Sequence, residues 1–435
     1  MTVLIDIAYL IALLAVSPFA IYRMLRHGRY RAGWANRFGK ISRKYPNKKC
    51  IWIHAVSVGE VNATTTLIRE LEAKFPDYEI VLSTTTDTGF ARANALFGNR
   101  LSVFYFPMDF SLTMKRAFAR INPAMCLLIE LELWPNLVRI AKQSGVPVIV
   151  VNGRLSERSL RRYNLIKGVT KKIFGNLTLA LAQSEEYAER FRQLGMPAER
   201  VIVTGSIKYD TAQVTDKVDG ADLLAAQLGL KNERLWVAGA TGNDEEQIIL
   251  DVYRRLVEQK QFADLRLAIV PRKPERFNDV AELIKQSGFE LTRYSELKAT
   301  ATIKSTIDNR QSAIRNVILG DTMGDLRKFY SLAAVIFVGR SLVPMGGSDM
   351  MEAAALGKCT IFGPYAFNFK QTVEDLLKAN GAILVKDADE LFNAMTKCLT
   401  DAGYAQRIAQ NGQQIIRKNQ GATARTIINI SKMLK

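Results

Sequence analysis

The stretch IWIHAVSVGEVNATTTLIRELEAKF, residues 51–75, decides the fold. Its first seven residues form the kind of compact apolar run found in strands of parallel sheets that helices cover on both faces. The turn Ser57-Val58-Gly59-Glu60 then leads into a segment with helical periodicity. Further apolar runs of this kind occur at 79–85, 102–107, 125–130, 147–153, 179–184 and 201–206. The alternation of strands and helices predicts a doubly wound α/β sheet.

The pattern restarts after a more polar connection, residues 209–233, that lacks strand character. Apolar runs follow at 234–240, 265–271, 316–321, 334–339, 359–364 and 382–386. A chain of 435 residues also exceeds what one hydrophobic core usually serves. We therefore expect two Rossmann-like domains facing a cleft, at 26–208 and at 234–435. The second domain is assigned the C-terminal helices, although the final stretch, 402–435, is compatible with packing on either half.

The composition is that of a folded, strongly basic protein. The chain has 60 Lys and Arg against 42 Asp and Glu, a formal net charge of +18, which implies an anionic partner such as nucleic acid, a membrane surface or a phosphorylated substrate. The hydrophobic fraction of 48% excludes disordered, collagen-like and coiled-coil chains. With no CxxC pair and only two histidines, neither a structural zinc site nor a disulfide framework is expected, and Cys50, Cys126, Cys359 and Cys398 are expected to be free buried thiols.

The N-terminal segment, residues 3–22, is apolar apart from Asp6, Ser17 and Pro18. About 20 residues at ~1.5 Å each cover the ~30 Å hydrocarbon core, so residues 1–25 are predicted to be a membrane anchor, either spanning or interfacial. A cleaved signal peptide or an ordinary buried helix are the alternatives. Residues 23–49 hold ten Lys and Arg and no acid, so this flank and everything after it are expected on the cytoplasmic side.

Candidate functional residues of the first half follow its strands, where ligands bind in open parallel sheets. Glu60 is either a functional carboxylate or a first-turn residue that complements the helix dipole. Glu130 and Glu132 lie beside Trp134 at a strand end, where unpaired carboxylates must be solvated or partnered. The hydroxyl-rich turn at 84–89 either caps a helix or contacts sugar hydroxyls.

The second half offers three ligand-type turns after strands, at 271–276, 320–325 and 346–352. The first combines a helix start with Arg272 and Lys273, which suits an anion. Together the three turns indicate a nucleotide site. A Walker A loop, a GxGxxG after the first strand and a DxD metal motif are all missing from the sequence. No metal is therefore expected, and Arg272, Lys273 and helix N-termini would neutralise a leaving phosphate.

Several sequence blocks together resemble the bacterial 3-deoxy-D-manno-octulosonic acid (Kdo) transferases of the GT-B type. The blocks are HAVSVGE (54–60), ELELWPN (130–136), NGRLSERS (152–159), AQSEE (182–186), VTGSIKYD (203–210), PRKPERF (271–277), GDTMGDL (320–326) and GRSLVPMGG (339–347). The resemblance implies an inverting glycosyltransferase of lipopolysaccharide biosynthesis. It would move Kdo from CMP-Kdo to a tetra-acylated lipid A precursor, lipid IVA, at the cytoplasmic face of the inner membrane, with no cofactor.

The same resemblance implies roles for individual residues. Glu60 would be the general base, and Glu130 and Lys208 would stabilise the transition state. The residues that would hold the CMP are Pro271, Arg272, Met323, Gly324, Asp325, Asp349, Met350, Met351 and Glu352. The chain departs from the family pattern at Gly242, Arg340 and Ser348-Asp349.

Two other functions remain as alternatives. One is a related GT-B enzyme that uses a UDP-sugar, either a transferase or an epimerase. The other is a non-catalytic basic protein that binds a membrane surface. Nucleic acid is not expected as a partner, because the basic residues cluster near the apolar N-terminus and at 154–172 without interleaved aromatic stacking platforms.

Overall fold

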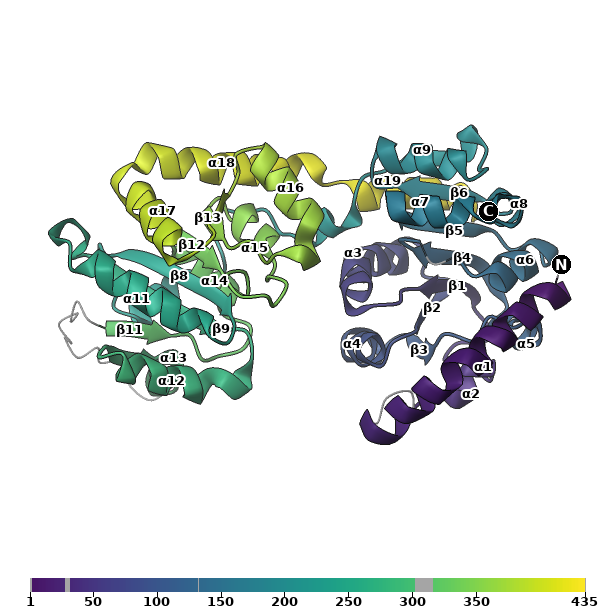
Figure 1. Cartoon of the computed structure of the whole chain (residues 1–435), viewed down its shortest axis with the longest axis horizontal. Helices are drawn as coiled ribbons and strands as arrows, with labels where there is room; N and C mark the ends of the chain where they lie inside the picture. Colours follow the sequence, from purple (N-terminus) through teal and green to yellow (C-terminus); the bar gives the residue numbers. More distant parts are fainter. Residues whose placement is uncertain (1, 28–31, 132, 302–315, 435) are drawn as a thin grey trace. The chain divides into compact units, whose positions relative to one another are not determined.

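The computed structural model describes residues 2–27, 32–131, 133–301 and 316–434, and its contacts divide the chain into two compact units (Figure 1). The first unit comprises Met1–Thr211 and Asn419–Lys435, and the second comprises Ala212–Lys418. Each unit contains one parallel sheet of seven strands with helices on its faces. The predicted α/β class with two doubly wound sheets is thus confirmed.

The sheet of the first unit has the strand order β3-β2-β1-β4-β5-β6-β7. Its strands are β1 Lys49–His54, β2 Tyr78–Thr84, β3 Ser102–Tyr105, β4 Pro123–Ile129, β5 Val148–Gly153, β6 Leu179–Ala182 and β7 Val201–Val203. Each coincides with one of the seven predicted apolar runs. Because the strand order reverses between β1 and β4, the topological switch point of this unit lies between those two strands.

Helices cover both faces of this sheet. They are α2 Trp34–Arg37, α3 Val58–Lys74, α4 Asp87–Phe97, α5 Ser111–Ile121, α6 Pro135–Gln143, α7 Glu157–Asn164, α8 Lys167–Gly175, α9 Glu185–Gln193, η1 Ala198–Arg200 and η2 Ile207–Thr211. In β1, Cys50 and Trp52 pack into one hydrophobic core, while Ile51 and Ile53 pack into the core on the opposite face. Burial on both faces explains why the strands are continuously apolar.

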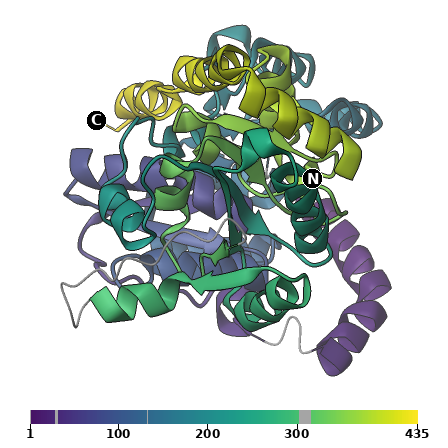
Figure 2. The same ribbon diagram turned by 90° about the vertical axis from the view of Figure 1, so that its left-hand side faces the viewer.

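The sheet of the second unit, seen from its own side in Figure 2, has the order β10-β11-β9-β8-β12-β13-β14. Its strands are β8 Arg234–Thr241, β9 Leu265–Pro271, β10 Glu290–Arg293, β11 Asn316–Leu319, β12 Val335–Val338, β13 Cys359–Phe362 and β14 Ile383–Leu384. The order reverses between β8 and β12, which flank this unit's switch point. The edge strand β10, of sequence ELTR, was not among the predicted strands, because it is partly exposed and carries no apolar run.

The helices of the second unit also lie on both faces of its sheet. They are α10 Ala221–Gln227, α11 Glu245–Val257, α12 Phe277–Gln286, α13 Tyr294–Ala301, α14 Leu326–Leu332, α15 Met350–Ala355, α16 Lys370–Lys378, α17 Ala388–Thr400 and α18 Ala402–Asn419, with η3 Lys260–Phe262, η4 Pro274–Arg276 and η5 Phe367–Phe369. The core of this unit includes Trp236 and Phe337 from adjacent central strands.

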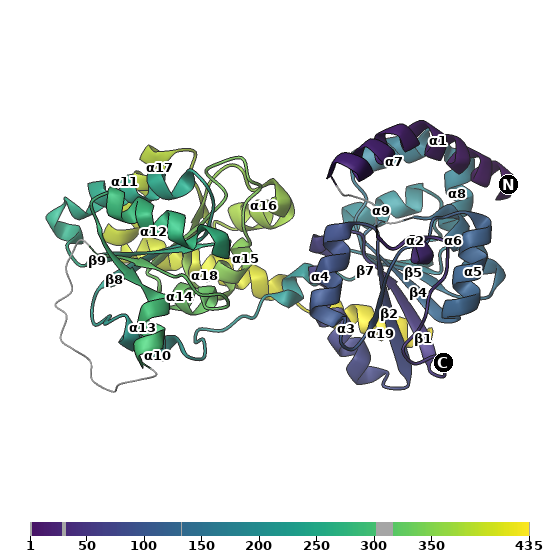
Figure 3. The ribbon, with the colours of Figure 1, turned by 90° about the horizontal axis from the view of Figure 1, so that it is seen from below.

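The C-terminal helix α19, Ala422–Ser431, belongs to the first unit, which corrects the assignment of all of 234–435 to the second domain. Asp210 is the physical reason, because its carboxylate accepts hydrogen bonds from Gly421 N at 2.6 Å and Thr423 N at 2.5 Å. These bonds cap the N-terminus of α19, whose Ile427 and Ile430 pack into the core beneath α3 (Figure 3).

The predicted connection at 209–233 is also shorter than expected. The division between the units falls after Thr211, and α10 packs on α13 and α14 of the second unit. Between β5 and β6 the chain forms two helices, α7 and α8, which are separated at Leu165 and Ile166. Both side chains are exposed there, at 85% and 55%.

Helix α1, Thr2–His27, runs along the outside of the first unit (Figure 3). Asp6 Oδ1 accepts hydrogen bonds from Ser111 N and Asn136 Nδ2, both at 3.0 Å, and Tyr9 donates to Asp109 at 3.0 Å. Asp6 thereby supplies the cap that α5 lacks from its own N-cap residue, Phe110. Across the residues that the structure describes, no helix is both long enough and apolar enough to cross a membrane.

Candidate active site

The first candidate site lies at the switch point between β1 and β4, where Glu60 is the third residue of α3. Ser57 is the N-cap, and its hydroxyl accepts from Glu60 N and donates to Glu60 Oε1 at 2.8 Å. Glu60 Oε2 accepts from Val56 N at 2.8 Å. The motif S-x-x-E therefore forms a capping box, and the helix-start interpretation of Glu60 holds together with any functional one.

Glu130 and Lys208 form an ion pair beside this turn. Lys208 Nζ, from η2, lies 2.6 Å from Glu130 Oε1, and both side chains are half-buried. Glu130 directly follows β4 and has a φ of 62°, a left-handed conformation that is unusual for glutamate and costs stability. Glu132, the second acid of this segment, lies outside the described residues.

Glu60 lies within electrostatic reach of both Glu130 and Lys208. Burial raises the pKa of Glu60 despite the hydrogen bonds from Val56 N and Ser57, which lower it; the negative charge of Glu130 adds to the rise, and the positive charge of Lys208 opposes it. A carboxylate with a raised pKa is a better proton acceptor in the neutral range than an ordinary glutamate. The structure thus brings together Glu60, Glu130 and Lys208, the three catalytic residues that the resemblance implies.

Asn152 is a positioning residue that the sequence analysis did not single out. It is buried at the end of β5 with a φ of 59°, and its Oδ1 accepts from Ile207 N at 3.1 Å, one residue before Lys208. Gln183 Nε2 donates to Asn152 O at 2.9 Å. The Asn-Gly pair that ends the predicted strand at 147–153 was the available signal, because asparagine tolerates the left-handed conformation.

The hydroxyl-rich turn at 84–89 caps a helix. Thr86 is the N-cap of α4, where its Oγ1 accepts from Gly89 N at 3.0 Å and donates to Val56 O at 3.0 Å. This second bond ties the turn after β2 to the turn that carries Glu60. The capping interpretation therefore accounts for Thr86.

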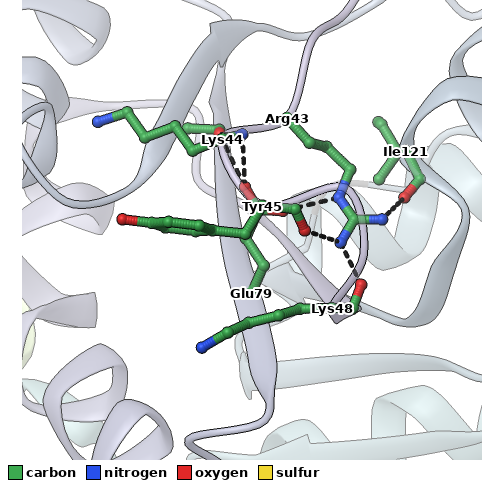
Figure 4. Close-up of polar contacts among 7 residues, drawn as sticks. Arg43, Lys44, Tyr45, Lys48, Glu79 and Ile121 are labelled. Atoms are coloured by element: carbon green, nitrogen blue, oxygen red, sulfur yellow. Dashed lines mark hydrogen bonds and ion pairs between the residues drawn. The ribbon is translucent and has the colours of Figure 1, made fainter.

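Several basic side chains of the run at 23–49 form hydrogen bonds and an ion pair within the first unit. Arg43 forms a buried ion pair with Glu79, in which Nε and Oε2 are 2.7 Å apart, and it donates to Ile121 O at 3.0 Å (Figure 4). Lys44 and Lys48 donate through Nζ to Gly98 O and Pro76 O, at 2.6 and 2.8 Å. These three cations bind the protein's own acceptors. Arg29 and Arg31 of the same run lie outside the described residues.

In the second unit, Arg272 follows β9 and opens the segment that leads to η4 and α12. Its backbone N donates to Thr241 O at 3.2 Å, and its side chain is exposed, whereas Pro271 is buried. The predicted strand-to-helix turn is present. Arg276 is held away from any ligand, because its guanidinium pairs with the buried Glu246.

In the turn at 320–325, Met323 and the backbone at Gly324 are accessible to a ligand, whereas the charged side chain of Asp325 already has partners within the protein. Asp325 accepts from Lys298, Lys328 and Thr322 at 2.9, 2.8 and 2.7 Å, and these contacts overcome the effect of burial to lower its pKa to about 2. Gly324 has a φ of 89° with open space where a side chain would lie, and Met323 is 67% exposed. Met323 and Gly324 are accessible, whereas the Asp325 carboxylate is already paired.

The turn at 346–352 brings two half-buried carboxylates to the end of β12. Asp349 is the N-cap of α15 and accepts from Met351 N at 2.9 Å. Burial raises the pKa values of both Asp349 and Glu352. The side chains of Met350 and Met351 are buried, so these two residues would contact a ligand only through their backbone.

The comparisons with known proteins agree with this picture. A family model described as "3-Deoxy-D-manno-octulosonic-acid transferase (kdotransferase)" matches residues 32–211. The 3-deoxy-D-manno-octulosonic acid transferase of Haemophilus influenzae is 35% identical over 92% of this chain and 91% of its own length. The enzyme of that name from Bordetella pertussis is 30% identical over 96% of this chain and 97% of its own length.

Among solved structures, a putative UDP-N-acetylglucosamine 2-epimerase from Listeria monocytogenes aligns with a TM-score of 0.55 at 13% identity, over 89% of this chain and 97% of that one. This likeness concerns the fold, and it agrees with the expected GT-B architecture. The extent of the sequence matches decides the family. The chain belongs to the 3-deoxy-D-manno-octulosonic acid transferase family.

Proposed function

We propose that the chain transfers Kdo from CMP-Kdo to the tetra-acylated lipid A precursor, lipid IVA, in an inverting reaction that needs no metal. Family membership supports the sugar and the reaction class. The observation that carries the mechanism is the cluster of Glu60, Glu130 and Lys208 at the switch point of the first unit, with Lys208 Nζ 2.6 Å from Glu130. This unit would bind the acceptor.

Glu60 would remove the proton from the attacking acceptor hydroxyl. The bonds from Val56 N and Ser57 Oγ fix its carboxylate, and burial raises its pKa towards the range in which a base is both ionised and effective. Glu130 would stabilise the positive charge that develops on the sugar ring of the donor. Lys208 would balance that carboxylate and stabilise the anionic groups of the donor.

The second unit would hold the CMP at its three turns. Arg272 has an exposed guanidinium for the phosphate, and the turn at Met323-Gly324 is open for close approach. Asp349 and Glu352 would accept hydrogen bonds from nucleotide N–H or O–H groups. Pro271, Asp325, Met350 and Met351 would shape the site through their backbone and packing.

The decisive experiment incubates the purified protein with CMP-Kdo and lipid IVA in EDTA and detects the glycosylated lipid by mass spectrometry. We expect product in EDTA. A parallel thermal-shift measurement compares CMP with UDP, because a bound ligand stabilises the folded state. Protection by UDP alone would favour the UDP-sugar alternative, and liposome binding without any transfer would favour the non-catalytic one.

We also propose that α1 attaches the protein to the cytoplasmic face of the inner membrane by lying in the membrane interface. Its polar residues Asp6 and Tyr9 bind the first unit, while Ile11 and Leu14 are each 63% exposed. An apolar helix face with a following basic segment suits an anionic membrane surface. Flotation with anionic liposomes tests this, and a double variant Ile11→Asp/Leu14→Asp that floats like the wild type would contradict it.

A further inference from the structure

Two strained residues mark the switch point of the second unit. Ala240 and Arg340 lie at the carboxyl ends of the neighbouring strands β8 and β12, with φ values of 54° and 60°. A left-handed conformation costs stability for any residue with a Cβ, and glycine would adopt it freely. A long cationic side chain at position 340, where glycine would be free of strain, therefore points to a use for that side chain there.

The surrounding backbone holds Arg340 in place. Its N–H donates to Glu245 Oε2 at 2.5 Å, its carbonyl accepts from Gly347 N at 2.8 Å, and its Nη2 donates to Met345 O at 3.1 Å. Gly242 provides the room for this side chain. A Cβ at position 242 would lie 2.5 Å from Met345 Sδ and 2.9 Å from Arg340 Cγ. The Arg340 side chain can therefore lie where it does because position 242 is a glycine.

The guanidinium of Arg340 lies within electrostatic reach of one acid, Glu245, and of another cation, Arg272. Within the described ranges of the chain, no carboxylate forms an ion pair with the side chain of Arg340 or with that of Arg272. Glu245 lies close, but its oxygens accept from the backbone N–H groups of Gly242, Arg340, Ser341 and Leu342. Burial lowers the pKa of Arg340, and the positive charge of Arg272 lowers it further, while the negative charge of Glu245 opposes the change.

Asp349 is an acidic neighbour of Arg272, whose charge tends to lower the pKa of that carboxyl. Its Oδ1 caps α15 through Met351 N, and the carboxylate makes no ion pair with Arg272 in the described structure. Two guanidiniums at the ends of nearby strands, neither of them in an ion pair with a carboxylate of the described residues, suit an oxyanion that both can bind.

We propose that Arg340 and Arg272 together bind the phosphate of the nucleotide donor. Gly242 leaves the room for the Arg340 side chain, and Met345 O accepts a hydrogen bond from its guanidinium. The proposal rests on the proposed function, since it assigns a part of the same donor site. Arg272 approaches from the end of β9 and Arg340 from the end of β12, on either side of β8. The phosphate would then lie over the end of β8.

The test is calorimetric titration of CMP and of cytidine into the wild type and the variant Arg340→Gly, together with thermal unfolding. Loss of one charged hydrogen-bonding partner should weaken CMP binding by about 10- to 100-fold. Cytidine, which lacks the phosphate, should bind both proteins equally. The melting temperature of Arg340→Gly should not fall, because glycine relieves the strain at a φ of 60°.

Arg255→Ala serves as the matched control, since it removes one positive charge from α11, where Arg255 pairs with Asp389. This variant should bind CMP like the wild type. Unchanged CMP binding by Arg340→Gly would overturn the proposal, and so would an equal loss of CMP and cytidine binding, which would show that Arg340 only supports its loop. An equal loss of CMP affinity in Arg255→Ala would show that the effect comes from the net charge of the protein, which would also contradict the proposal.

The choice of nucleotide in the wild type tests the CMP-Kdo donor independently of Arg340. If the wild type binds UMP but not CMP, the donor assigned above is wrong, and the ratio of UMP to uridine affinity in Arg340→Gly then decides the role of Arg340. A wild type that binds neither monophosphate would overturn both proposals.

Discussion

Replacement of Glu60 by glutamine separates its two roles. In the structure the carboxylate accepts from Val56 N and from Ser57 Oγ, both at 2.8 Å. A glutamine keeps both contacts, with its carbonyl on Val56 N–H and its NH₂ on Ser57 Oγ, and a capping box accepts Gln as well as Glu. The free energy of unfolding should therefore change by less than about 1 kcal/mol.

The effect on the reaction should be far larger. General-base catalysis contributes about 10²- to 10⁴-fold, which corresponds to about 2.7–5.5 kcal/mol of activation free energy. We expect Glu60→Gln to lower kcat by that factor in the CMP-Kdo and lipid IVA assay. Glu60→Ala should lose the base and the capping contacts, so that its kcat and its stability both fall.

The pH profile provides an independent check. Burial, and secondarily Glu130, raise the pKa of Glu60, so the wild-type rate should fall on acidification at a pH above the ordinary range of glutamate. The glutamine variant should lack this acidic limb. Ser184→Ala is the matched control, because it removes an N-cap of α9, should cost about 1 kcal/mol of stability and should leave kcat unchanged. A Glu60→Gln enzyme within threefold of the wild-type kcat would refute the assignment of the base.

Three further predictions concern stability. Arg43→Ala should cost about 3–5 kcal/mol in urea unfolding because it leaves Glu79 buried without its ion pair, whereas the double variant Arg43→Met/Glu79→Leu should recover much of this; equal losses in the two would contradict the ion-pair explanation. Burial raises the pKa of Asp109 to about 7 from an ordinary 3.8, so between pH 4 and pH 7 the folded state binds a proton that the unfolded state has lost, and the stability of the wild type should decline over that range. Asp109→Asn should lack this decline, and the same dependence of melting temperature on pH in both proteins would contradict the prediction. Asp210→Ala removes the acceptor for Gly421 N and Thr423 N, so hydrogen exchange in α19 should accelerate while that in α9 stays unchanged; unaltered exchange in α19 would show that the cap is dispensable.

The strands were predictable because parallel strands buried on both faces leave a direct apolar signal. That signal identified all seven strands of the first sheet and missed only β10 in the second, where the edge position permits polar residues. The rule that ligands bind beyond the carboxyl ends of parallel strands also singled out Glu60 and Glu130, which follow β1 and β4. The resemblance supplied Lys208, whose position depends on the contact between Asn152 and Ile207 across 55 residues of sequence.

The unpredicted features are those that depend on contacts between distant segments. The basic run suggested a membrane-facing surface, yet Arg43 pairs with Glu79, which lies 36 positions further along. The C-terminal helix was assigned to the wrong domain because its cap, Asp210, lies more than 200 residues before it. Charge pattern and periodicity carry no information about such partners, since a solvated and a buried arginine have the same sequence signature.

The two proposed sites share one backbone feature, a left-handed residue at the end of a strand. In the part of the chain that the structure describes, seven non-glycine residues have a positive φ, and four of them are Asn or Asp, which tolerate it: Asn122, Asn152, Asp244 and Asn380. The other three are Glu130, Ala240 and Arg340, at the ends of β4, β8 and β12. These are three of the four strands that flank the two switch points. Since a left-handed residue turns the chain sharply off its strand, we expect the same backbone feature to orient an acid at the proposed acceptor site and a guanidinium at the proposed nucleotide site.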